Sequence, residues 1–406
     1  MTGDAACPVL SAEGAVTVAA ALAADFAPGA AERDRTRALP RAELDRLAAS
    51  GLLAITVPQE YGGAGLAPST VAEVVRILAT ADPNIAQIPH SHFVYVNLLR
   101  LAATPEQLAH YSRALLTGAR IANAQAERNG PTAADISTTL TPAGDGFRID
   151  GTKYYCTGSL FADILAVLTR LDDPDGVSGL AEGQYVAFLP AAATGVHIVD
   201  DWGAIGQRTT GSGTIHFDGV TIARSQVVPR AGAVNAPSGY GAFAQLMHAA
   251  IDAGIARGAL DAAAAFAREH SRPWFEAEVP RAIDDPLLIQ RFGELAVTVR
   301  SAEASLAVAG TAVDAAITDK PGSRDVAAEA SLAVATAKII TDRAANEVSS
   351  ALFEVTGTRS TAADLNLDHF WRNARTHTLH DPVRWKFQHI GRALLHGTAP
   401  PFHSAI

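Results

Sequence analysis

The segments WGAIGQRTTGSGTIHFDGV, residues Trp202–Val220, and GTKYYCTG, residues Gly151–Gly158, decide the fold of this chain. Both lie in a span, residues 131–240, in which Gly, Pro and Thr are frequent. Short runs of alternating polarity in this span predict strands, and Asp-Gly pairs predict turns. The predicted strands are Gly146–Ile149, Tyr185–Leu189, Gly195–Val199 and Thr214–Phe217, with turns at Asp145-Gly146, Asp150-Gly151 and Asp218-Gly219. We therefore expect a small antiparallel β domain.

On both sides of this span the sequence predicts helices. Residues 1–130 carry apolar side chains at three-to-four spacing, for example over Arg41–Ser50 and Ser69–Ala81. Residues 241–406 contain three long Ala-rich segments that predict a helical bundle: Gln245–His270, Pro286–Ala315 and Asp325–Phe353. The expected order is an N-terminal helical domain (1–130), a central β domain (131–240) and a C-terminal helical bundle (241–406).

The composition indicates a folded protein and argues against some classes of partner. Of 406 residues, 48% are hydrophobic and 18% are charged, which is unlike a disordered chain. The formal net charge of -10 argues against nucleic acid and against an anionic membrane surface as partners. Cys7 and Cys156 are far apart, which fits a reducing cytoplasm, and the apolar stretch Ala15–Ala24 is too short to span a membrane. We expect a soluble cytoplasmic protein.

Familiar cofactor and metal motifs are not found in the sequence. It contains neither a Gly-rich dinucleotide loop after a predicted strand nor a phosphate-binding loop that ends in Lys. His90 and His92, and likewise His377 and His380, have no carboxylate at a familiar metal-ligand spacing. The sequence therefore predicts no metal site.

Polar and aromatic residues gather in a few short clusters of this Ala-rich chain. They are Pro89–Phe93, Asn123–Glu127, Lys153–Ser159, Trp202 with Arg208–Ser212, Arg272–Trp274 and Phe370–Pro382. A planar cofactor needs aromatic walls and hydrogen-bond donors of this kind. Each cluster also has an ordinary structural interpretation, such as a core Trp or a satisfied buried His. The residues alone indicate an enzyme with an undetermined cofactor.

Several of these segments resemble the acyl-CoA dehydrogenase superfamily over nearly the full length of the chain. Trp202–Val220 is similar to the signature of that family's central β domain, and Gly151–Gly158 is similar to its flavin-lining strand. The resemblance implies an α+β fold with an N-terminal helical domain, a central β-barrel or sandwich, and a C-terminal four-helix bundle.

Within the superfamily the chain most resembles the dibenzothiophene monooxygenase branch. The resemblance rests on Ser271–Trp274, Phe353–Arg359 and Phe370–Pro382. It implies a homotetrameric two-component monooxygenase that receives FMNH2 from a separate NAD(P)H:flavin reductase. Such an enzyme forms a flavin 4a-hydroperoxide with O2 and transfers one oxygen atom to a small organosulfur compound, such as a sulfur heterocycle.

The resemblance also implies residues that would surround the flavin ring. Asn123 and Thr157 would face the ring, and the Thr157 hydroxyl would hydrogen-bond a nitrogen of its central part. Tyr155 and Trp202 would form walls of the ring and substrate pocket. We also expect a lid over this pocket, formed by Glu127–Ile136.

Further implied roles concern oxygen chemistry and the cofactor's phosphate. His92 and His380 would face the oxygen-binding side as donors or proton relays, because a neutral imidazole both donates and accepts. With Asn123 and Thr157 they form the expected catalytic set. Ser212 would contact the ribityl chain or phosphate, joined by Arg272 and Arg359 of a neighbouring subunit.

Two departures from the dehydrogenase pattern leave alternatives open. His380-Asp381-Pro382 stands where a dehydrogenase carries its Glu base, so a FAD-dependent acyl-CoA dehydrogenase would have to use Asp381. Arg272-Pro273-Trp274 replaces a segment that holds the adenine half of FAD, which favours FMN. An N-oxygenase of the same fold and a catalytically silent scaffold are further alternatives.

Overall fold

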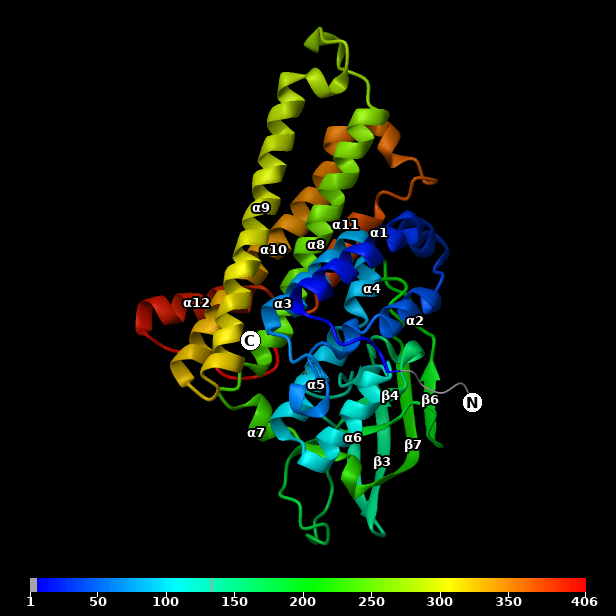
Figure 1. Cartoon of the computed structure of the whole chain (residues 1–406), viewed down its shortest axis with the longest axis vertical. Helices are drawn as coiled ribbons and strands as arrows, with labels where there is room; N and C mark the ends of the chain where they lie inside the picture. The colour runs from blue at the N-terminus through cyan, green and yellow to red at the C-terminus, as the bar shows by residue number, and fades with distance from the viewer. Residues whose placement is uncertain (1–5, 133) are drawn as a thin grey trace.

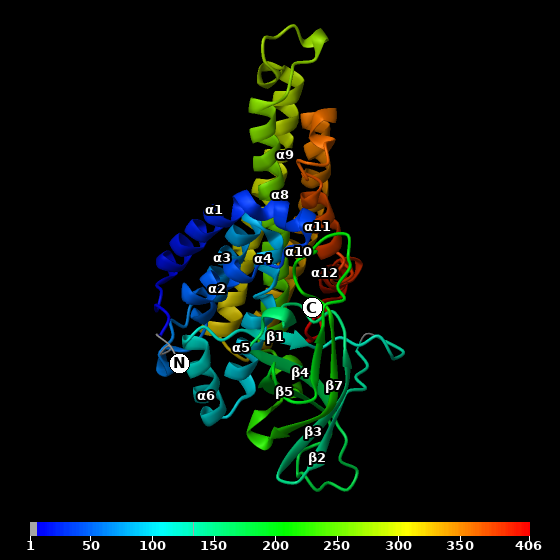
Figure 2. The same ribbon diagram turned by 90° about the vertical axis from the view of Figure 1, so that its right-hand side faces the viewer.

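The computed structural model describes residues 6–132 and 134–406. Helices come first, a sheet follows, and long helices complete the chain, so the predicted order is confirmed. In Figure 1 the sheet lies at the lower end of the molecule and the long helices rise above it. In Figure 2 the first N-terminal helices (blue) pack beside the bundle above the sheet, and the later ones (cyan) lie beside the sheet.

The N-terminal helices bury one apolar face each. They are α1 (Ala12–Thr36), α2 (Arg41–Ala49), α3 (Pro68–Ala81), α4 (Pro83–Gln87), α5 (His90–Ala102) and α6 (Pro105–Leu116). Pro at the first position and a capping box between Thr104 and Gln107 start α6. Helix α1 is long and apolar enough to cross a membrane by length and composition, but it packs against α3, and core helices pass the same test.

One sheet of eight strands forms the middle of the chain. The strands are β1 (Ile121–Ala124), β2 (Thr139–Ala143), β3 (Gly146–Lys153), β4 (Ile164–Leu171), β5 (Gln184–Pro190), β6 (Val196–Val199), β7 (Thr214–Ala223) and β8 (Val227–Pro229). Their order is β6-β7-β3-β2-β4-β5-β8, with β1 paired to β4. The end strands β6 and β8 do not pair with each other in the described part of the chain, so the sheet is open.

The four predicted strands are confirmed, but three details of the β prediction are wrong. The sheet is mixed, because β1 and β2 each pair with β4 in parallel. It also begins at Ile121, inside the span predicted to be helical, since a four-residue strand carries almost no periodic signal. The division at 130 and 240 otherwise stays a prediction.

The third detail concerns the Asp-Gly pairs. Asp145-Gly146 does mark the hairpin between β2 and β3. Asp150-Gly151 and Asp218-Gly219, in contrast, lie opposite each other inside β3 and β7, where the register shifts. The Gly219 N–H donates to Asp150 Oδ1 at 2.9 Å. These residues form a bulge, which uses the same residue types as a turn.

Three long helices form the C-terminal bundle, as predicted. The helices of this region are α7 (Ala231–Val234), α8 (Tyr240–Glu269), α9 (Pro286–Asp314), α10 (Arg324–Thr356), α11 (His369–His377) and α12 (Arg384–His396). Helix α8 packs against α3, α9 and α10, so most of its length is buried. The elements η1 (Leu52–Ala54), η2 (Gln59–Tyr61), η3 (Ser159–Phe161), η4 (Arg224–Gln226), η5 (Phe275–Ala277), η6 (Ala282–Asp284), η7 (Ala315–Asp319) and η8 (Thr358–Thr361) are short helical turns.

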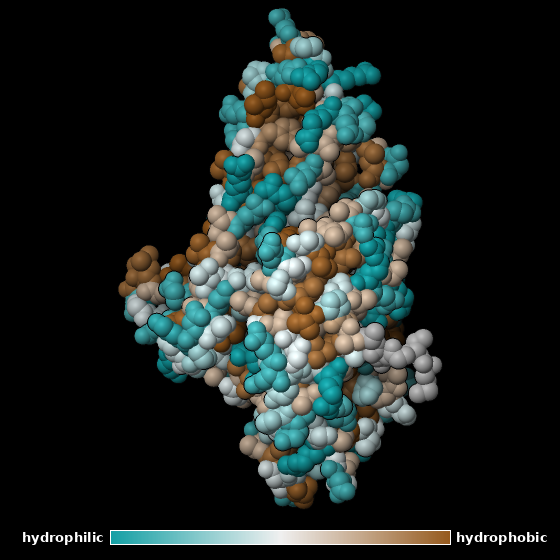
Figure 3. Space-filling model, viewed as in Figure 1, coloured by the Kyte–Doolittle hydropathy of each residue, from teal (hydrophilic) through white to brown (hydrophobic). Residues whose placement is uncertain are grey.

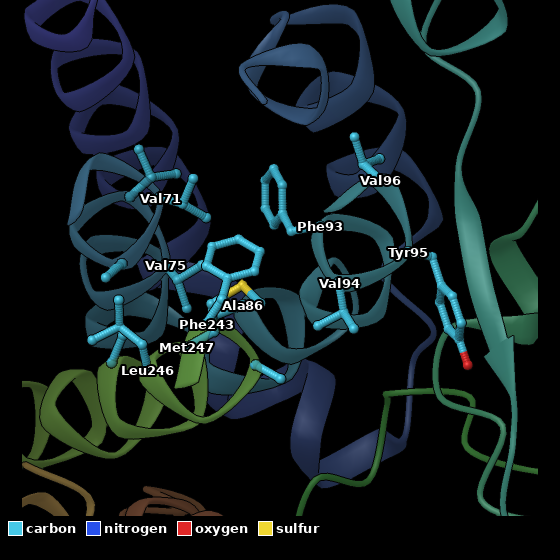
Figure 4. Close-up of a cluster of buried hydrophobic side chains, with 14 of the residues drawn as sticks. Val71, Val75, Ala86, Phe93, Val94, Tyr95, Val96, Phe243, Leu246 and Met247 are labelled. Atoms are coloured by element: carbon cyan, nitrogen blue, oxygen red, sulfur yellow. The ribbon is translucent and has the colours of Figure 1, made fainter. Parts of the chain in front are cut away.

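A single apolar core joins the N-terminal helices to the bundle. In Figure 4, Val71 and Val75 of α3 face Phe243 and Met247 of α8, while Phe93 of α5 closes the cluster. Burying side chains of this size stabilises the fold by ~1.5–3 kcal/mol each. This packing holds α5 and α8 rigidly against each other, and both helices contribute to the site described below.

Large apolar side chains remain exposed on two helices of the bundle. They are Leu287, Ile289, Val297 and Val308 of α9 and Trp385, Phe387, Leu394 and Leu395 of α12. Figure 3 shows the corresponding brown surface on the upper bundle and on the protruding α12. Surfaces of this kind often mark contacts between proteins.

Candidate active site

A cavity of ≈ 420 Å³ lies where the sheet meets α5, α8 and α11. This volume is typical of small-molecule sites, at roughly 300–1,000 Å³. Six predicted site residues from distant parts of the sequence line it: Asn123, Tyr155, Thr157, Trp202, Ser212 and His380. The structure therefore brings most of the predicted set together.

The sheet side of the cavity carries a chain of hydroxyl groups. Thr157 Oγ1 lies 2.8 Å from Ser212 Oγ, which lies 2.7 Å from Thr210 Oγ1. Across the cavity rim, the Ser91 hydroxyl donates to Asn123 Oδ1 at 3.1 Å. These groups are held in place by neighbours and offer both donors and acceptors to a ligand.

Two aromatic side chains form an edge of the cavity. The rings of Tyr155 and Trp202 meet edge to face, with centroids 6.1 Å apart. Trp202 Nε1–H donates to the Gln207 carbonyl at 2.7 Å, which fixes the indole. Tyr155 is 47% exposed and has a φ of 58°, a strained left-handed conformation for a non-Gly residue. Tyr155 thus lines the cavity and is also exposed to solvent.

Gln207 is a site residue that the sequence analysis missed. It also has a left-handed φ, of 51°, and is buried, yet both polar atoms of its side-chain amide lack a partner among the described residues. Gln87, Gln245 and Thr376, which also line the cavity, each have a buried oxygen in the same state. Leaving such groups unsatisfied costs ~1–3 kcal/mol each. A ligand with a polar edge would satisfy them.

Four histidines form the helical side of the cavity. The ring of His248 lies between those of His90 and His380, with centroids 4.0 Å and 3.9 Å away. His377 Nε2 lies 3.0 Å from His248 Nδ1. Burial lowers the pKa of His90 to about 3 and lowers the pKa values of His248 and His377 as well. These three rings are therefore neutral near pH 7.

The structure does not bring His92, a predicted catalytic residue, to the main cavity. Its Nε2 lies 2.8 Å from the Leu53 carbonyl, and its Nδ1 accepts from the Ile121 N–H at 3.2 Å. Both ring nitrogens are thus used by the backbone, and the side chain points away from the main cavity into the core. His90, two residues earlier on α5, faces the cavity instead. The helix turns by about 200° over two residues, which explains the exchange.

The two predicted arginines lie away from the cavity of their own chain. Arg359 Nη1 donates to the His270 carbonyl at 2.8 Å, and both Arg272 and Arg359 are exposed. Neither lines the cavity. Their expected contact with a phosphate of a neighbouring subunit stays a prediction.

Asp381 is poorly placed to act as a base. Its carboxylate lies 3.0 Å from Lys386 Nζ and 3.4 Å from His380 Nδ1, and it does not line the cavity. Burial alone would raise the pKa of Asp381, but the hydrogen bond from His380 and the charges of Lys386 and Lys338 lower it below its ordinary value. A carboxylate with so low a pKa is a weak base.

The predicted lid, Glu127–Ile136, is tied down at both ends by one carboxylate. Glu127 Oε1 accepts from Lys153 Nζ at 2.6 Å and from the Thr138 hydroxyl at 2.8 Å, and Glu127 Oε2 accepts from the Ser137 N–H at 2.9 Å. Arg128 lies over the Tyr155 ring at 5.0 Å. The segment thus starts beside the cavity mouth; its residue Ala133 lies outside the described residues, and its function as a lid stays a prediction.

His248, His377 and Gln245 were also missed, for a plain reason. His248 and Gln245 lie on the long Ala-rich helix α8, whose apolar periodicity does not distinguish them. His377 lies in the polar and aromatic cluster Phe370–Pro382, but no role was predicted for it. A search for polar residues within otherwise Ala-rich helices could have found His248 and Asp252 on α8.

Known proteins match this chain over almost its entire length. Three family models match: the acyl-CoA dehydrogenase N-terminal domain at residues 14–119, the middle domain at 122–220 and the C-terminal domain at 246–385. Dibenzothiophene monooxygenase of Rhodococcus qingshengii is 35% identical, over 95% of this chain and 94% of that protein. A probable FMNH2-dependent monooxygenase, SfnC of Pseudomonas putida, is 32% identical, over 96% of this chain and 97% of that protein.

A solved structure resembles this one closely. FMN-bound TdsC of Paenibacillus sp. A11-2 is 33% identical, with a TM-score of 0.91, over 97% of this chain and 100% of that chain. The likeness therefore extends over almost the whole chain.

Proposed function

This chain belongs to the acyl-CoA dehydrogenase family, on its dibenzothiophene monooxygenase branch, and on this premise we propose that it is a reduced-flavin-dependent monooxygenase. FMN is its cofactor, used in the reduced form, and its substrates are O2 and a small organosulfur compound. One oxygen atom goes to the sulfur and the other leaves as water, while FMNH2 supplies two electrons.

One observation carries this proposal. Buried polar atoms of Gln87, Gln207, Gln245 and Thr376 surround the cavity without partners among the described residues. An isoalloxazine ring has carbonyl, imide and ring-nitrogen groups along its edges, so it offers both donors and acceptors to such side chains. The Thr157 and Asn123 side chains lie in the same cavity and fit the same ring edge. The residues present therefore fit a flavin.

The remaining cavity residues fit the needs of oxygen transfer. Tyr155 and Trp202 provide an apolar wall against which an aromatic or aliphatic sulfur compound packs. The neutral rings of His90 and His248, with the ring of His380 beside them, provide proton donors and acceptors on the opposite side. Ser212, bonded to Thr157, lies close enough to that residue to share the same ligand.

The enzyme would work with protein partners of two kinds. A separate NAD(P)H:flavin reductase in the cytoplasm would supply FMNH2. Further copies of this chain would complete a homotetramer, and the exposed apolar side chains of α9 and α12 support such contacts. Arg272 and Arg359 would then reach a neighbour's FMN phosphate, for which guanidinium groups are well suited.

The test is oxygen labelling under single-turnover conditions. The protein is mixed with photoreduced FMN without oxygen, and then with ¹⁸O₂ and dibenzothiophene or a smaller thiophene. We expect one labelled oxygen atom in the organosulfur product and none when only the water is labelled. FMNH2 without protein is the control. Co-purification of tightly bound FAD that an acyl-CoA bleaches would instead indicate a dehydrogenase and contradict the proposal.

A further inference from the structure

A buried charged pair lies directly behind the cavity histidines. Asp252 of α8 and Lys338 of α10 are both fully buried, and Lys338 Nζ lies 2.6 Å from Asp252 Oδ2. The other oxygen, Asp252 Oδ1, lies 2.5 Å from His377 Nδ1. His377 Nε2 in turn lies 3.0 Å from Nδ1 of His248, and His248 precedes Asp252 by one turn of α8. The four side chains form a continuous path from the bundle interior to the cavity.

The carboxylate determines where the protons of both imidazoles lie. An ionised carboxylate only accepts, so Nδ1 of His377 carries the proton. Neutral His377 then accepts at Nε2, and the donor is Nδ1–H of His248. Neutral His248 is left with a lone pair on Nε2, which forms no hydrogen bond with the described residues. One carboxylate thus sets two tautomers in series.

Lys338 balances the charge of this path. An isolated buried carboxylate beside His377 would favour the imidazolium, because opposite charges attract strongly where water is excluded. With Lys338 present the pair is neutral as a whole. Burial and the charge of Lys338 lower the pKa of His377 and outweigh the attraction of Asp252. Both histidines therefore stay neutral and can accept a proton.

We propose that Asp252 and Lys338 are positioning residues that make His377 and His248 a two-step proton path between the cavity and the bundle interior. A proton taken up at Nε2 of His248 releases the Nδ1 proton of the same ring to Nε2 of His377. The Nδ1–H bond of His377 to Asp252 stays intact, and the reverse sequence returns the proton. This inference rests on the proposed function, in which the untransferred oxygen leaves as water and needs protons.

Other charged groups face the same path from every side. His90 lies on α5, His380 and Asp381 follow α11, and Lys386 lies on α12. Asp342, one turn after Lys338 on α10, is half-buried, and burial raises its pKa to about 6. The neighbours of the path thus include both carboxylates and lysines.

The first experiment replaces Lys338 by Met and follows thermal unfolding of the flavin-free protein as a function of pH. In the wild type the pKa of His377 in the folded protein lies below the value of ~6.5 that a His has in the unfolded chain. The stability that neutral His377 contributes is therefore lost as pH falls below ~6.5. In Lys338→Met the unbalanced carboxylate raises that pKa, so protonation stabilises the fold. The Tm deficit of the variant should therefore shrink from pH 8 to pH 5.5.

A second measurement separates positioning from mere structural support. In Lys338→Met we expect FMN to bind within about threefold of wild type, while the acid limb of the single-turnover rate moves up by about one pH unit or more. The double variant Asp252→Asn/Lys338→Met is also uncharged as a pair, so its Tm should follow pH like wild type. The single-turnover rate of the double variant should be at least about tenfold lower than that of the wild type, because Asn does not set the tautomers of His377 and His248.

The controls make failure informative. Arg257→Met breaks the Arg257–Glu303 pair between α8 and α9, away from the cavity, and should lower Tm by the same amount at every pH. A constant deficit in Lys338→Met, or a double variant with wild-type rate, would overturn the inference. If the wild type transfers no oxygen at all, the proposed function fails, whereas the Tm measurements still test the charge balance.

Discussion

The two walls of the cavity differ in how the chain builds them. The sheet wall comes from three short segments, Asn123–Ala126, Tyr155–Thr157 and Trp202–Ser212, and each lies in a polar or aromatic cluster of the sequence. The helical wall takes scattered side chains from α4, α5, α8 and α11 and from the turn after α11, and α10 supports it. Residues that line a site from loops are close together in the sequence and can be recognised as a motif. Residues that line it from helix faces are scattered along the sequence and cannot.

The walls also differ in chemistry. The sheet wall offers hydroxyls, amides and aromatic rings, which suit binding and orientation. The helical wall offers four histidines backed by a buried ion pair, which suits proton transfer. We expect substitutions in the two walls to separate flavin binding from turnover, and the following predictions test that division.

The largest effect is expected from His248→Phe on the helical wall. An aromatic ring is kept, but both ring nitrogens at position 248 and the hydrogen bond to His377 are lost, so the two-step path is broken. Turnover should fall about 100-fold or more, the scale of a lost acid–base group. Equilibrium binding of FMN, followed by fluorescence quenching, should change little. Equal losses in FMN binding and in turnover would show that the two walls do not have separate roles in binding and turnover.

Thr157→Val on the sheet wall should act mainly on binding. It removes a hydroxyl and leaves Ser212 without this partner, at a cost of ~1–2 kcal/mol, or about 10-fold in the Kd of FMN. Thr157→Ser restores the hydroxyl and should bind FMN nearly as well as the wild type. A Val variant with unchanged Kd would mean that Thr157 does not contact the cofactor.

Lys153→Met tests the root of the predicted lid. It leaves Glu127 buried without its cation, so the free energy of unfolding at pH 7 should fall by ~3–5 kcal/mol. The effect depends on pH, because the hydrogen bonds to Lys153 and Ser137 outweigh burial and lower the pKa of Glu127 to about 2. The stabilisation by ionised Glu127 is present above ~4.3, the pKa of a Glu in the unfolded chain, and is lost as pH falls through about 2.

Denaturant unfolding from pH 7 down to pH 3 measures this dependence. The gap between Lys153→Met and wild type should narrow toward acid. A gap that widens instead would contradict the assignment of Glu127 as the partner. Lys386→Met, which breaks the pair with Asp381, serves as a comparison at another buried lysine.

The smallest effect on turnover is expected from His92→Gln, although His92 resembled a catalytic residue. The change disturbs two hydrogen bonds to backbone groups and should cost ~1–3 kcal/mol of stability. Turnover of the folded fraction should stay within about threefold of wild type. His90→Gln, on the cavity side of the same helix, is the matched control and should lower turnover much more.

His90 and His92 show how far the sequence determines this site. The segment Pro89–Phe93 does reach the cavity, but through His90 rather than through the predicted His92. Two residues on a helix differ by more than half a turn, and the start of α5 at His90 decides which side chain faces the cavity. Only the packing of α5 against the sheet sets that rotation.

Local sequence determined the elements and the loop-borne half of the site. Apolar periodicity predicted α8, α9 and α10, alternating runs predicted β3, β5, β6 and β7, and the polar loops supplied Thr157, Trp202 and Ser212. These signals are short-range, because they depend on backbone geometry over a few residues. The resemblance carried by other segments, Ser271–Trp274 among them, indicated FMN.

Tertiary structure alone decided the rest. Asp252 and Lys338 are 86 positions apart, and nothing near either residue predicts that they form a buried pair. Their partner His377 comes from a third helix. Contacts of this kind arise from the packing of whole helices, so they depend on every side chain in the core between them. The proton path behind the cavity therefore follows from the packing of α8, α10 and α11, and it could not be predicted from the sequence.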